Sequence, residues 1–115
     1  MIAKCRRACK TFGSCALALA TMAASAAEPA TADQGRALFA KHCVHCHGER
    51  GFATAQLEKR IGKEQAMLEK RTDLNAALIR HVVRYGIGSM PWFTRVELSD
   101  ADAAAIAAYL TRNNR

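Results

Sequence analysis

The stretch Cys43-Val44-His45-Cys46-His47 decides the expected fold of this chain. It holds two cysteines separated by two residues, and a histidine follows the second cysteine directly, which is the attachment pattern of a c-type haem. The spacing lets both thiols form thioether bonds to vinyl groups on adjacent pyrrole rings, and it leaves the imidazole beneath the iron. The sequence therefore predicts one covalent haem c on Cys43 and Cys46, with His47 as an axial iron ligand.

Two other kinds of site use the same residue types. A closed structural zinc site needs four ligands, usually as two pairs, but His81 is the only histidine after His47 and no cysteine follows Cys46. A thioredoxin-like redox pair belongs in a strand–helix–strand context, and the residues around the motif show no strand pattern. Haem attachment is therefore favoured over both.

Residues 1–27 have the pattern of a secretory signal peptide. Four basic residues precede an apolar run at 15–24, and Ser25-Ala26-Ala27 offers small residues for cleavage before Glu28 or one residue earlier. The apolar stretch 15–27 is shorter than the roughly 20 residues that span a bilayer. We expect export to a bacterial periplasm, with no membrane span after cleavage.

Cleavage would leave residues 28–115 as a single domain. Three of the five cysteines, Cys5, Cys9 and Cys15, would leave with the signal, so that both remaining thiols belong to the haem motif. The formal charge would fall from +7 to +3, because the signal holds four basic residues and no acid. A nucleic-acid-binding domain is expected to carry a strong basic stripe, so no nucleic-acid partner is expected.

Helical periodicity and caps predict an all-α fold with about three main helices. The first begins at a capping box, Thr31-x-x-Gln34, and the last begins at a second box, Ser99-x-x-Asp102. The expected helices run from the first box to about Lys41, from a cap at Thr72 or Asp73 to about Tyr85, and from Asp100 to about Arg112. Residues 52–71 show little periodicity, although 64–71 contains good helix formers.

Two apolar stripes follow from the helical spacing. In the middle helix the stripe is expected to pack on haem or on neighbouring helices, and it consists of Leu74, Leu78, Val82 and Tyr85. In the last helix the stripe has Tyr109 beside it and consists of Ala103, Ile106, Ala107 and Leu110. Gly86 is expected to end the middle helix in the left-handed conformation.

Met90 is the predicted second axial ligand of the iron. It lies in a glycine-rich loop before Pro91, which can bring a thioether onto the distal face. Met67 lies in a charged, helical segment where methionine usually fills space. His81 is the rival ligand, and it would make a bis-histidine haem. His42 and His45 are expected to face solvent.

The haem motif, Met90-Pro91 and parts of the first and last helices resemble the class I cytochromes c. Gly35 and Phe39 resemble the first helix of that family, and Ile106 and Tyr109 resemble its last-helix pair. The resemblance implies an all-α fold round the haem, in which these two helices cross at the glycine. One departure is the missing proline after the motif, whose carbonyl oxygen binds the proximal imidazole in the family. A carbonyl within residues 51–54 is expected to take that role here.

A closer similarity concerns residues 84–93 and 96–100. They resemble the cytochrome subunit of p-cresol methylhydroxylase and eugenol-hydroxylase-type flavocytochromes. That resemblance implies a flavin-containing dehydrogenase as electron donor.

The sequence therefore predicts a non-enzymatic electron carrier that docks transiently with a redox protein. The expected docking rim consists of Gly48, Ile87, Pro91, Trp92 and Phe93, with at least one of the two aromatic residues buried against haem. The alternative function is a haem enzyme or gas sensor with an open sixth coordination site.

Overall fold

The computed structural model describes residues 31–115. The expected signal peptide, with Cys5, Cys9 and Cys15, lies outside these residues. The described part contains six α-helices, one 3-10 turn and no β-strand, which confirms the all-α prediction. The elements are α1 (Ala32–His42), α2 (Val44–His47), α3 (Phe52–Ile61), α4 (Lys63–Ala66), η1 (Leu68–Lys70), α5 (Ala76–Tyr85) and α6 (Asp100–Thr111). Within 31–115, none of the helices has the length and apolar character needed to cross a membrane.

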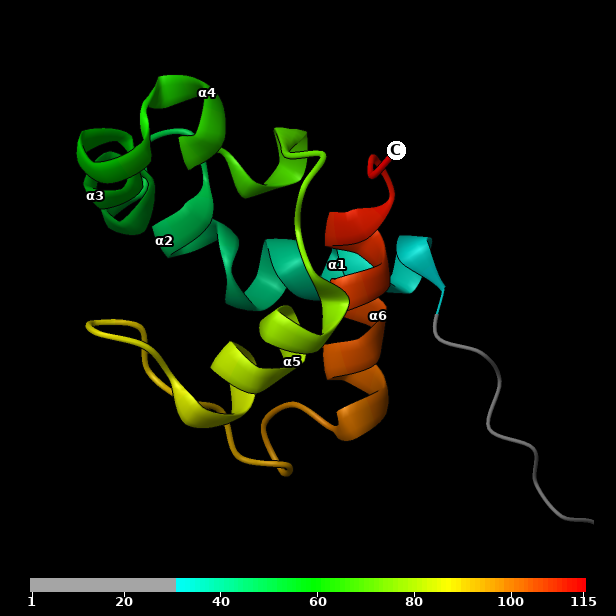
Figure 1. The fold of residues 1–115 in the computed structure, drawn as a ribbon. Coiled ribbons are helices and arrows are strands. Elements are labelled where there is room, and N and C mark those ends of the chain that lie inside the picture. The colour runs from blue at the N-terminus through cyan, green and yellow to red at the C-terminus, as the bar shows by residue number, and fades with distance from the viewer. Residues whose placement is uncertain (1–30) are drawn as a thin grey trace, which may run out of the picture.

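Helices α1 and α6 cross in the centre of the molecule (Figure 1). A side chain at Gly35 would collide with the carbonyl oxygen of Ala105 and would lie 2.7 Å from the Cβ of Tyr109. Next to this contact the rings of Phe39 and Tyr109 pack with centroids 5.9 Å apart. The glycine therefore lets the two backbones approach, as the resemblance to class I cytochromes implied.

Helix α6 supplies most of the hydrophobic core. Its buried residues are Ala103, Ala105, Ile106, Ala107, Tyr109 and Leu110. The predicted capping box is present, because Ser99 and Asp102 each accept a hydrogen bond from the other's backbone N–H, at 3.1 Å. At α1 only half of the predicted box forms. Thr31 accepts from the N–H of Gln34 at 3.2 Å, but the Gln34 side chain reaches Asp102 instead of its own cap.

The predicted start of the middle helix is wrong by a few residues. Helix α5 is capped by Asn75, whose side chain accepts hydrogen bonds from the N–H groups of Ala77 and Leu78. Neither expected cap is used, and Asp73 instead forms an ion pair with Arg71 at 2.7 Å.

The core-facing side of α5 also differs from the predicted stripe. Ile79 and Val83 are buried in the core, whereas Leu78 and Tyr85 are 56 % and 72 % exposed. The stripe therefore does not pack on the neighbouring helices along its whole length. Gly86 ends α5 with φ +71°, as predicted.

Residues 52–71 form structure that the sequence pattern did not reveal. Helix α3 lies between two glycines, Gly51 at its N-cap and Gly62 at its C-cap. The helix expected over 64–71 is broken, because Met67 is extended (φ −84°, ψ 99°) between α4 and η1. The break lets Ala66 be buried while Glu69 accepts a hydrogen bond from the hydroxyl of Tyr109. Tertiary contacts thus outweigh helix propensity in this segment.

The end of the chain fastens η1 to α6. The carbonyl oxygen of Glu69 accepts hydrogen bonds from Arg112 at 3.1 Å and from Asn113 at 2.9 Å. The guanidinium of Arg112 also lies 4.0 Å from the centre of the Tyr109 ring, in the geometry of a cation–π contact. These contacts fix the irregular segment between α4 and α5 against the last helix.

Candidate haem site

The cysteine–histidine motif forms a compact turn at the end of α1. Cys43 lies between α1 and the single-turn helix α2, and His47 is the last residue of α2. Backbone N–H groups of Cys46 and His47 both donate to the carbonyl oxygen of Cys43, at 3.1 and 2.8 Å. A side chain at Gly51 would collide with the carbonyl oxygen of Cys46. The glycine therefore lets α3 begin directly against the motif.

Both thiols of the motif are free. Cys43 is half-buried and Cys46 is exposed. Burial, together with the neighbouring Cys46, raises the pKa of the Cys43 thiol to about 11. A redox-active thiol pair normally has a lowered thiol pKa, and the raised pKa of Cys43 is opposite to that pattern.

The imidazole of His47 is held in its neutral form. Burial lowers its pKa below the ordinary value, and a neutral imidazole has the free electron pair that a metal ligand needs. Its Nδ1 is buried, and no other described residue forms a hydrogen bond with it. The carbonyl expected within residues 51–54 is therefore not in hydrogen-bonding position.

The loop after α5 presents Met90. Ile87 and Met90 exchange backbone hydrogen bonds of 3.2 and 2.9 Å, which close a tight turn. The chain then returns to α5, where the N–H of Phe93 donates to the carbonyl oxygen of Val83 at 2.9 Å. Met90 is half-buried, and it packs against the same hydrophobic core as Cys43. Figure 1 shows this loop and α2 on the same side of the molecule.

The remaining histidines and Met67 are placed differently. His81 is exposed on α5 and stacks on Tyr85, with ring centroids 4.7 Å apart. His45 is exposed as predicted, but His42 is half-buried with its ring edge-on to Phe93 at 6.1 Å. The prediction that His42 faces solvent is therefore wrong.

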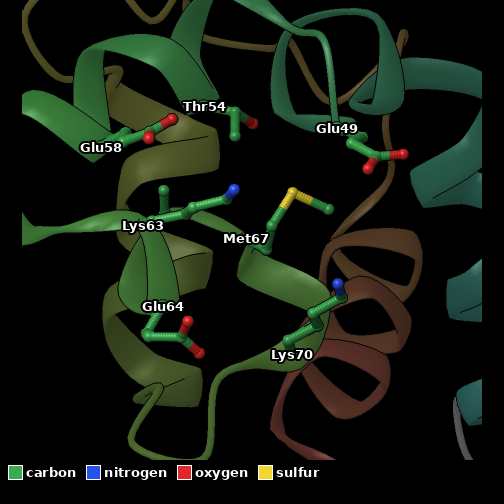
Figure 2. Close-up of a pocket in the computed structure, with 8 residues that line it drawn as sticks. Glu49, Thr54, Glu58, Lys63, Glu64, Met67 and Lys70 are labelled. Carbon is green, nitrogen blue, oxygen red and sulfur yellow. The ribbon is translucent and has the colours of Figure 1, made fainter.

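Met67 borders a separate cavity of about 130 Å³ (Figure 2). The charged side chains round it come from α3, α4, η1 and the loop after α2, and the lining consists of Glu49, Thr54, Glu58, Lys63, Glu64, Ala66, Met67 and Lys70. None of the four predicted haem-binding residues lines it. Its mixed charges also differ from the apolar surroundings that a porphyrin ring requires.

Large apolar side chains are exposed near the motif and near Met90. Val44 lies within the motif and Phe52 follows it, and Ile87 and Trp92 lie on either side of Met90, with exposed fractions from 44 % to 64 %. Phe93 is half-buried, whereas Gly48 is buried and is therefore wrongly placed in the predicted docking rim. The residues present fit a haem, because they combine two free thiols, a neutral imidazole, a thioether and apolar surface.

Arg84 was not predicted as a functional residue of this region. Its guanidinium donates to the carbonyl oxygens of Phe93 and Thr94, where the Met90 loop ends. Arg84 begins the stretch 84–93 that resembles the flavocytochrome subunit, but no periodicity gives its side chain a role. Only its position in the last turn of a helix, directly before the loop, could have indicated the role.

One family model matches residues 30–110, the greater part of the chain, and its description is "Cytochrome C oxidase, cbb3-type, subunit III". No curated protein and no solved structure is significantly similar to the chain.

Proposed function

Because the chain belongs to the family of cytochrome c domains described as cytochrome c oxidase, cbb3-type, subunit III, we propose that it is a periplasmic monohaem electron carrier. Family membership makes it a c-type cytochrome that binds haem c and transfers electrons. The proposal adds the ligands: Cys43 and Cys46 bind the haem covalently, and His47 and Met90 bind the iron. The observation that carries it is the pairing of the motif turn with a methionine loop on one hydrophobic core.

Each residue has a distinct part in this function. The bound haem supplies one-electron chemistry at its iron. The neutral imidazole of His47 and the thioether of Met90 would occupy both axial positions, which leaves no open position for a substrate or a gas. Leu78 and Val82 on α5 would cover the porphyrin and exclude water. The exposure of Leu78 supports this placement.

The proposed partner is a redox protein that docks at the exposed rim of the Met90 loop. Trp92 is 61 % exposed and Ile87 is 64 % exposed, so both offer apolar contact area for a small transient interface. The sequence of this loop resembles the cytochrome subunit of flavocytochromes, and we therefore propose a flavin-containing dehydrogenase as the donor. Co-purification with a flavoprotein, and reduction of the haem when its substrate is added, would support that donor.

The first experiment replaces Met90 in the holoprotein purified from periplasm. The ferric wild type is expected to show the weak far-red absorption band of a thioether–iron bond, and Met90→Ala is expected to lose it and to bind carbon monoxide when reduced. Met67→Ala is the matched control, because Met67 borders the separate cavity. It should keep the band.

The opposite result would favour the alternative function. If the wild type lacks the band and its reduced form binds carbon monoxide, the sixth position is open, and the protein is an enzyme or a gas sensor. The mass of the purified protein tests the remaining parts of the proposal, since one haem and cleavage after residue 26 or 27 each give a defined value.

A further inference from the structure

The side chain of Arg84 connects three parts of the fold. It lies in the last turn of α5, and only 11 % of it is exposed. Its Nη1 donates to the carbonyl oxygens of Phe93 at 3.1 Å and of Thr94 at 3.4 Å. Its Nε and Nη2 lie 3.0 and 2.9 Å from Oδ1 of Asp100. A single guanidinium, carried by the last turn of α5, thus binds the end of the Met90 loop and the first residue of α6.

Asp100 gives this connection a rigid base. It is the first residue of α6, where the helix dipole favours a carboxylate. Its Oδ2 accepts a hydrogen bond from Nε of Arg95 at 2.9 Å. Hydrogen bonds from Arg95 and Arg84 hold the pKa of Asp100 below its ordinary value, so the carboxylate stays charged at neutral pH. Arg84 is therefore fixed to the helix that forms most of the core.

The points of attachment bracket Met90 closely. The loop leaves α5 after Tyr85 and is tied again at Phe93 by the Val83 carbonyl and at Phe93 and Thr94 by Arg84. Within residues 87–92 the only other backbone hydrogen bonds are those between Ile87 and Met90. The position of the methionine thus depends on a short segment whose far end is held by one backbone hydrogen bond and by the side chain of Arg84.

We propose that Arg84 is a positioning residue that holds the Met90 thioether on the haem iron by fixing the end of its loop to α5 and α6. This inference rests on the proposed function, because it requires Met90 to be the distal ligand. Binding two carbonyl oxygens and a carboxylate at once requires a guanidinium, because its planar group donates in several directions. A lysine ammonium is a compact point charge and cannot make the same set of contacts.

The test compares holoprotein variants by the rate at which imidazole displaces the methionine from ferric iron. In Arg84→Gln and Arg84→Lys the loop opens more readily, and imidazole should bind about tenfold faster, the factor that corresponds to the loss of roughly 1.4 kcal/mol of hydrogen bonding. On heating, the far-red band should disappear at a lower temperature than the helical circular dichroism signal.

Arg95→Gln is the matched control. It removes an arginine from the same Asp100 carboxylate, but Arg95 donates no hydrogen bond to the loop carbonyls that bind Arg84. It should leave the imidazole rate within about twofold of the wild type, since an exposed ion pair contributes little. Both signals should then be lost together on heating.

Two results would overturn the inference, and only the second would also overturn the proposed function. If the wild type shows the far-red band and the Arg84 variants exchange no faster than Arg95→Gln, Arg84 has only a structural role. If the wild type has no such band, the assignment of Met90 fails, and the positioning role fails with it. Should Arg84→Gln not fold, Arg84→Lys and Asp100→Asn give the same comparison.

Discussion

Single residues decide where the two central helices can meet. Gly35 has no space for a Cβ, because the Ala105 carbonyl occupies it. The resemblance to class I cytochromes c indicated this residue together with Phe39, and the fixed spacing that haem attachment needs indicated Cys43, Cys46 and His47. The roles of Arg84 and Asn75 could not be predicted in this way. Arg84 binds carbonyl groups of a separate loop and Asn75 binds neighbouring N–H groups, and neither kind of contact produces a periodic sequence pattern.

Gly35→Val is therefore expected to destabilise the fold by about 3 kcal/mol or more, since the added atoms meet backbone that cannot move aside. The midpoint of urea unfolding measures the loss. Ala37→Val, on the exposed side of the same helix, is the control and should change stability by less than about 1 kcal/mol. Equal effects of the two substitutions would show that the crossing tolerates a side chain.

At the scale of elements, caps and stripes predicted some helices much better than others. Helix α6 combines a complete capping box with an apolar stripe, and both were visible in the sequence. Helix α3 is bounded by glycines and buries only Thr54, so its pattern was too weak to detect. The break at Met67 could not be predicted, because it depends on contacts with the end of α6.

The start of α5 gives a direct test of the corrected cap. Asn75→Ala removes the acceptor for two backbone N–H groups, at 2.8 and 3.0 Å, and should lower the free energy of unfolding by about 1 kcal/mol. Thr72→Ala, at one of the two cap positions that the sequence pattern predicted, should have almost no effect. A larger loss for Thr72→Ala would mean that the helix begins earlier than Ala76.

At the scale of the whole molecule, carboxylates couple stability to pH. Hydrogen bonds lower the pKa values of a set of surface acids, Asp73, Glu97, Asp100 and Asp102. The folded protein therefore binds protons less tightly at these sites than the unfolded chain does. Their contribution to stability is present above the ordinary carboxyl pKa of about 4, and it is lost as the pH falls through the lower folded values.

Acidification from pH 6 towards pH 3 should accordingly lower the urea midpoint. In Asp102→Asn the decrease should be smaller, because the hydroxyl and N–H of Ser99 no longer favour a charged group at that position. Stability measured at each pH step gives the slope. A variant slope as steep as that of the wild type would show that the capping box does not contribute to the pH dependence.

The uneven distribution of the core has a consequence for biosynthesis. The residues around Cys43 and Cys46 are synthesised before α6, which provides most of the buried side chains. The nascent chain therefore carries its two thiols on a segment that has nothing to fold against. If haem is joined to these thiols before α6 has packed, the factor that attaches it would meet an unfolded peptide, and a chain truncated before Ser99 is expected to lack a stable core.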